Sequence, residues 1–137
     1  MAYILYIIGF SIFALLGSIH LLYTLYSNKF DAYDSSVTQA MKGTSIILTK
    51  ETTLWKAWVG FNASHSLGLI FIAIIYITLD LKYFDVIEQS LLLSLLPILI
   101  GLSYLILAKK YWFSSPFIGI DSLIRLKFVS TCFLIID

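Results

Sequence analysis

Charged residues are scarce in this sequence: Asp, Glu, Lys and Arg together make up 12% of its 137 residues. Hydrophobic residues make up 60% and the mean hydropathy is +0.94, values well above those of soluble domains. Nine basic and eight acidic residues leave a formal net charge of +1, so there is no basic surplus for neutralising phosphates. The composition therefore excludes a water-soluble globular domain and argues against nucleic acid as a partner.

Cysteine and catalytic motifs are also lacking. Cys132 is the single cysteine, which excludes an intramolecular disulfide and a zinc site built from cysteines. The sequence contains no nucleophile motif, P-loop or dinucleotide fingerprint. Catalytic residues are thus unknown from the sequence, and whether the protein is an enzyme stays open.

Long apolar runs are abundant, at residues 2–26, 57–79, 90–108 and 116–136. Each is close to the roughly 20 residues that cross about 30 Å of hydrocarbon as a helix. Four such runs leave no room for a second domain. We therefore predict an all-α fold, a single transmembrane domain over residues 1–137 in which four spans form a helix bundle in the lipid bilayer.

The fourth run is the least apolar, because it contains Asp121, Arg125 and Lys127. A charge near the centre of a span costs roughly 2.5 to 3.5 kcal/mol. The i,i+4 spacing of Asp121 and Arg125 predicts an ion pair, which lowers that cost. An interfacial or re-entrant helix is the alternative for this run.

The lysines of the connections predict the orientation. The first connection contains Lys29, Lys42, Lys50 and Lys56, the second only Lys82, and the third Lys109 and Lys110. Because basic residues favour the cytoplasmic side, the first and third connections of this multi-pass protein are expected in the cytoplasm.

The first connection is long enough to hold a helix of its own. Ser36 and Gln39 fit a capping box, and apolar residues then recur at helical spacing as far as Ile47 and Leu48. We expect a short amphipathic cytoplasmic helix, either lying on the membrane surface or covering a site. In the third run, small residues share one face with Pro97, which predicts close helix packing; they include Ser94, Gly101 and Ala108.

Residues 50–68 are the most informative segment. At about 100° per residue, polar and aromatic side chains share one helical face, and small ones share another. The first face contains Glu51, Trp55, Trp58, Asn62 and His65; the second contains Ala57, Gly60, Ser64 and Gly68. The second pattern is a common device for helix association.

His20 is the other histidine within an apolar run. From the rise of a helix, His20 and His65 lie roughly 9 and 13 Å from the cytoplasmic ends of their spans. Both imidazoles are therefore expected to face one polar pocket between spans one and two. Its predicted ligand-binding residues are His20, Glu51, Trp55, Trp58, Asn62, His65 and Ser66.

Several functions fit such a pocket. The histidines could simply join the helices by hydrogen bonds, as in a structural or accessory subunit of a membrane complex or a homo-oligomer. The pocket could bind a membrane-soluble molecule such as a quinone or lipid between tryptophan walls. His20 and His65 could ligate a haem in an electron-transfer subunit. A non-haem metal has too few ligands here, and acid–base catalysis by His65 with Glu51 is the remaining option.

The run KETTLWKAWVGFNASH, from Lys50 to His65, resembles an uncharacterised family of small four-span bacterial integral membrane proteins. The segments around Gly17 and His20, and Lys110 to Phe113, are similar to the same family, so the resemblance covers most of the chain. It implies a four-span topology and a bacterial source, and therefore a place in the cell inner membrane, but no activity or catalytic residue. The charges in the fourth run depart from the family pattern.

Overall fold

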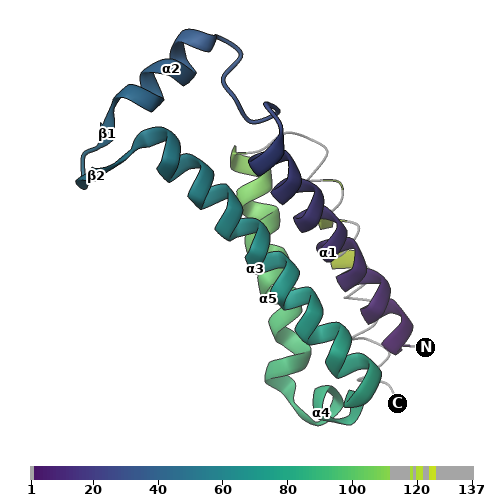
Figure 1. Cartoon of the computed structure of the whole chain (residues 1–137). Coiled ribbons are helices and arrows are strands. Elements are labelled where there is room, and N and C mark those ends of the chain that lie inside the picture. The colour runs from purple at the N-terminus through teal and green to yellow at the C-terminus, as the bar shows by residue number, and fades with distance from the viewer. Residues whose placement is uncertain (1, 112–117, 119, 122–123, 126–137) are drawn as a thin grey trace. The chain divides into compact units, whose positions relative to one another are not determined.

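A computed structural model describes residues 2–111, 118, 120–121 and 124–125 of the chain (Figure 1). The described chain is mostly helical. In order, its elements are α1 (Ala2–Tyr26), α2 (Ser35–Gly43), β1 (Ser45–Ile46), β2 (Thr49–Thr53), α3 (Leu54–Lys82), α4 (Phe84–Gln89) and α5 (Leu91–Tyr111).

Three of these helices, α1, α3 and α5, are long and apolar enough to cross a membrane. They correspond to the first three predicted spans, and α3 exceeds its predicted bounds by three residues at each end. The membrane class of the protein follows from these three helices. The fourth predicted span lies almost entirely outside the described residues, and the four-span bundle stays a prediction.

The described residues form two compact units, one with residues 2–13 and the described residues from 72 onward, and the other with residues 14–71. An aromatic core holds the first unit. The rings of Phe10 and Tyr76 stack with centroids 4.5 Å apart, and Tyr6 meets Phe84 edge-on at 6.3 Å. Tyr6, Phe10 and Tyr76 are all buried, so this cluster joins the start of α1 to the second half of α3.

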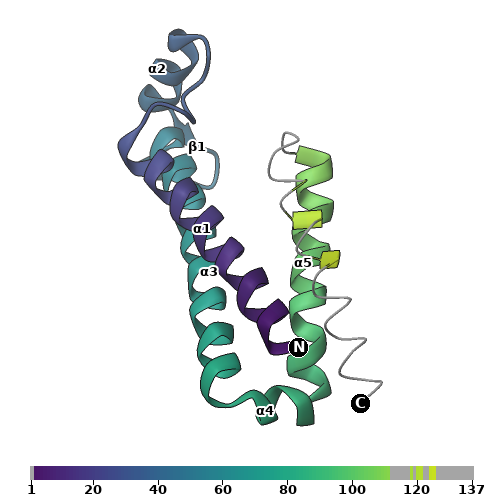
Figure 2. The ribbon, with the colours of Figure 1, turned by 90° about the vertical axis from the view of Figure 1, so that its right-hand side faces the viewer.

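The turn between α3 and α5 belongs to the first unit and contains α4, which was not predicted (Figure 2). Ile87 of α4 is buried, and the Ser94 hydroxyl of α5 donates to its carbonyl over 2.7 Å. Ser94, Pro97, Gly101 and Ala108 are buried, which confirms the predicted packing face of α5. The predicted pair is also confirmed: Arg125 Nε donates to Asp121 Oδ2 at 2.8 Å.

In the second unit, the end of α1 packs closely on the start of α3. A Cβ atom added to Gly17 would lie 3.0 Å from the Ser66 carbonyl oxygen and 3.2 Å from Leu69 Cβ. Only glycine allows the two backbones to approach this closely. Gly17 therefore sets the spacing of the helices on which His20 and His65 lie.

The connection between α1 and α3 contains the predicted helix, but its start differs. Asp34, two residues earlier than the predicted Ser36, is the N-cap, and its Oδ1 accepts from the Ser36 N–H at 2.8 Å. A carboxylate at this position accepts a hydrogen bond from a free backbone N–H, and its negative charge is attracted to the positive end of the helix dipole. The capping box of Ser36 with Gln39 was therefore wrong, although the helix itself is present.

The prediction that the apolar face of this helix continues to Leu48 was also wrong. The helix ends at Gly43, and residues 45–53 form the antiparallel hairpin β1–β2, with Ser45 opposite Thr53. β-branched residues dominate this stretch and favour extended backbone over helix. Ile47 and Leu48 lie at the exposed turn of the hairpin.

Candidate functional site

The polar centre of the second unit is a hydrogen bond between its two apolar helices. His20 Nε2 of α1 lies 3.2 Å from Asn62 Oδ1 of α3. The Asn62 Nδ2 group donates to the Trp58 carbonyl at 2.9 Å, which fixes the amide orientation. Because Oδ1 can only accept, the Nε2 atom of His20 must carry the proton and donate it.

His65 completes the centre. The His20 and His65 rings meet edge-on, with centroids 5.6 Å apart. The predicted approach of the two imidazoles across neighbouring helices is thus confirmed. Both residues are half-buried, as is Asn62. We call His20, Asn62 and His65 the histidine cluster.

Phe30, in the connection after α1, covers His20 and was missed by the sequence analysis. The two ring centroids are 4.5 Å apart. Trp58 of α3 donates its Nε1–H to the Phe30 carbonyl at 3.4 Å, so this tryptophan fixes the covering segment. A lone phenylalanine in a polar connection is the only signal that could have pointed to this role.

Ser66 contributes to helix packing. Its side chain is fully buried, and its hydroxyl donates to the Asn62 carbonyl of the same helix at 2.9 Å. The predicted small-residue face lies elsewhere on α3: a Cβ atom at Gly60 or Gly68 would meet nothing within 4 Å, and Ser64 is exposed. Within the described part of the chain, close packing therefore uses Ser66 and not that face.

Glu51 and Trp55 differ from the helical arrangement predicted for them. Helix α3 begins at Leu54, and Glu51 is an exposed residue of β2, so its assignment to the helical face was wrong. The predicted acid–base pair of His65 and Glu51 required both residues on one helical face, and they do not share one. Trp55 lies beneath the Lys42 ammonium, 5.1 Å from the ring centroid, and so contacts α2.

The geometry does not suit a haem held by both histidines. An axial imidazole needs a nitrogen lone pair directed at the iron. The Nε2 atom of His20 instead carries a proton donated to Asn62, and the two rings are already in edge contact. Among the described residues, no three His, Cys, Asp or Glu side chains gather where they could hold a metal ion.

Comparison of the chain with known protein families, with curated proteins and with solved structures finds no match. The resemblance carried by residues 50–65 therefore stays a prediction, and the interpretation of the site depends on its own geometry.

Proposed function

We propose that this protein is a multi-pass inner-membrane protein that binds a membrane-soluble small molecule, such as a quinone or a lipid, at the histidine cluster. The supporting observation is the approach of the His20 and His65 ring centroids to 5.6 Å, on two helices that are long and apolar enough to cross a membrane. Polar side chains are costly in hydrocarbon, and those that persist there usually serve binding or transport.

The cluster offers the chemistry that such a ligand needs. A neutral imidazole has one donor and one acceptor nitrogen, and the Nε2–H of His20 is donated to Asn62, so His20 offers a ligand the acceptor nitrogen Nδ1. The ring of Phe30 supplies a flat apolar surface beside His20, and the indole N–H of Trp58 holds the Phe30 backbone in place. A ligand with a polar, planar head and an apolar tail suits this combination.

The lysine-rich connection favours the cytoplasmic side for Phe30 and for the end of α1 at Tyr26. The histidine cluster then lies in the cytoplasmic half of the membrane, within reach of a headgroup entering from that leaflet. The same orientation puts the third connection in the cytoplasm.

Mass spectrometry of an organic extract of the purified protein tests the proposal. Wild type should yield a stoichiometric compound that His65→Leu loses. Ser64→Leu is the matched control, because Ser64 is exposed and its hydroxyl donates to Phe61 of its own helix. Ser64→Leu should keep the compound.

Equal amounts of compound in wild type and His65→Leu would contradict the proposal. An absorption spectrum of the same wild-type sample covers the electron-transfer alternative. A Soret band that disappears in His65→Leu would replace the small-molecule proposal by haem binding.

A further inference from the structure

The turn of the β1–β2 hairpin exposes two large apolar residues. Ile47 and Leu48 form the turn and are 108% and 91% exposed, so the described part of the chain buries neither. Two-residue hairpin turns favour Asn and Gly, whose backbones readily adopt a positive φ, and neither residue of this turn has one. The two side chains therefore serve neither the turn conformation nor the packing of the described chain.

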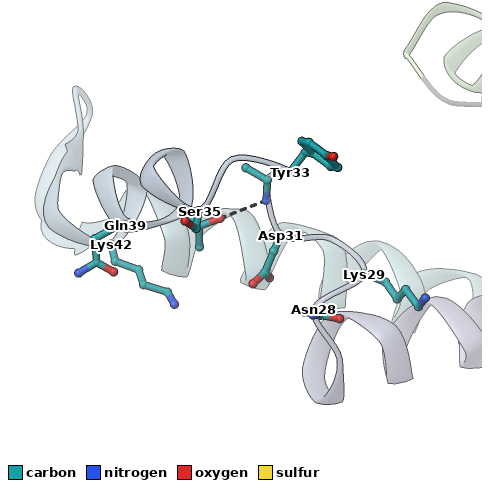
Figure 3. A pocket seen from close by; sticks show the side chains of 9 residues that line it. Asn28, Lys29, Asp31, Tyr33, Ser35, Gln39 and Lys42 are labelled. Carbon is teal, nitrogen blue, oxygen red and sulfur yellow. Dashed lines mark hydrogen bonds between the residues drawn. The ribbon is translucent and has the colours of Figure 1, made fainter.

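The apolar turn contrasts with the surface between α1 and α2. Figure 3 shows a concavity there, with a volume of about 650 Å³. Most of the side chains that line it are polar or charged, among them Asn28, Asp31 and Gln39. Water suits such a surface well, whereas it is an unfavourable environment for the hairpin turn.

The hairpin is fixed to the start of α3. Ser45 of β1 pairs with Thr53 of β2, and the Leu54 N–H donates to the Thr44 carbonyl at 2.9 Å. Because β2 ends at Thr53 and α3 begins at Leu54, no residue separates the hairpin from the helix. Figures 1 and 2 show the hairpin beside the first turn of α3, with the start of α2 farther from that helix. The turn is therefore held near one end of α3.

The length of α3 places this end in a headgroup layer of the membrane. The helix has 29 residues and is roughly 43 Å long at about 1.5 Å per residue. A bilayer with its headgroup layers is about 40–45 Å thick, so both ends of such a span lie at headgroup level. Trp55 and Trp58 in the first two turns are typical of a helix at the membrane interface. The hairpin beside them lies against the same layer of lipid.

We infer that the hairpin inserts Ile47 and Leu48 into the membrane surface beside α3. Apolar side chains gain free energy on leaving water, and the lipid beside α3 is the apolar phase nearest to them. Lys50, two residues after the turn, is exposed and adds attraction to anionic headgroups. The inference does not depend on the function proposed for the histidine cluster.

Electron paramagnetic resonance of the full chain in vesicles tests the inference. A nitroxide label is attached to Ile47→Cys or Leu48→Cys, with Cys132→Ser removing the native thiol. The vesicles are made of phosphatidylcholine, which has no net charge, so charge attraction alone cannot hold the turn on them. Collisions of the label with oxygen, which concentrates in lipid, are compared with collisions with a water-soluble nickel chelate.

The ratio of oxygen to nickel collisions should be several-fold higher at both turn positions than in Val37→Cys. Val37 is the matched control, because it is an exposed apolar residue in the first turn of α2. A ratio at the turn equal to that of the control would show that the turn lies in water and would overturn the inference. Low collision rates with both reagents would show that protein, such as a second copy of the chain, covers the turn, which also overturns it.

A charge placed at the turn gives a second test. Leu48→Asp should lower the collision ratio of the label on residue 47 several-fold, because a carboxylate resists transfer from water into lipid. Val37→Asp adds the same charge to an exposed apolar residue of α2 and should leave that ratio unchanged. The inference fails if Leu48→Asp has no larger effect than Val37→Asp.

Discussion

Asn62 joins two apolar helices through one amide: its Oδ1 accepts from His20 of α1, and its Nδ2 donates to the Trp58 carbonyl of α3. Both ends of the amide are therefore used, and neither can turn without breaking a bond. In a membrane-spanning pair such a link sets the rotation of α1 relative to the first half of α3.

Replacing Asn62 by Leu should destabilise the protein by about 0.5 to 2 kcal/mol, because the Nε2–H of His20 then has no acceptor on α3. Unfolding in mixed micelles with increasing denaturing detergent would measure the loss. Ser64→Ala is the control and should change the free energy of unfolding little, since the Ser64 side chain is exposed and bonds only within α3. Equal stability of the two variants would contradict the role of Asn62.

Gly17→Ala should be destabilising by about 1 to 3 kcal/mol, because the new methyl group would lie 3.0 Å from the Ser66 carbonyl oxygen. Gly60→Ala is the matched control. It adds the same methyl group to a helix at a position with nothing within 4 Å, and its better helix propensity should leave stability unchanged or slightly raised. The same unfolding measurement compares them, and a neutral Gly17→Ala would refute the close contact.

Phe30→Ala should expose the histidine cluster, because the ring 4.5 Å from His20 would be gone. The rate at which diethyl pyrocarbonate modifies the two histidines should rise several-fold. Tyr33→Ala serves as the control, since Tyr33 is fully exposed in the same connection and its removal uncovers nothing of the cluster. An unchanged rate in Phe30→Ala would mean that the ring does not shield His20.

The cap of α2 should weaken in acid. Hydrogen bonding from the side chain and backbone of Ser36 lowers the pKa of Asp34 below its ordinary 3.8. A lowered pKa in the folded state means that the cap stabilises α2 above pH 3.8 and that this contribution is lost as the pH falls through the folded-state pKa.

The Ser36 amide resonance, followed by NMR during acid titration, should move with a midpoint below 3.8. Asp34→Asn keeps a capping oxygen but has no proton to gain, so its resonance should not titrate over that range. A midpoint at or above the ordinary value would contradict the role of the Ser36 contacts.

The sequence predicted the three long helices well because their apolar runs are long and unbroken. It also predicted that His20 and His65 would meet, since both depths follow from the rise of a helix. The hairpin was missed because Ile47 and Leu48 continue the helical spacing of apolar residues. The β-branched residues around them favour an extended backbone over a helix.

The covering role of Phe30 could not be predicted in the same way. It depends on how the irregular connection after α1 folds back, which no sequence periodicity predicts. It also depends on the single hydrogen bond from the Trp58 indole N–H to the Phe30 carbonyl. Among the described residues, a Cβ atom at Gly60 or Gly68 of the predicted small-residue face meets nothing, whereas one at Gly17 would meet the backbone of Ser66; the close approach there is set by a glycine of α1.

The contact at Gly17 has a consequence for movement within the second unit. If α1 tilts against α3 while this contact is kept, the displacement of α1 grows with distance from Gly17 along the helix. His20 lies about 4.5 Å beyond Gly17 and Tyr26 about 13.5 Å beyond it, at a rise of about 1.5 Å per residue. A small swing at the imidazoles therefore becomes a threefold larger one at the helix end, where the chain continues towards Phe30.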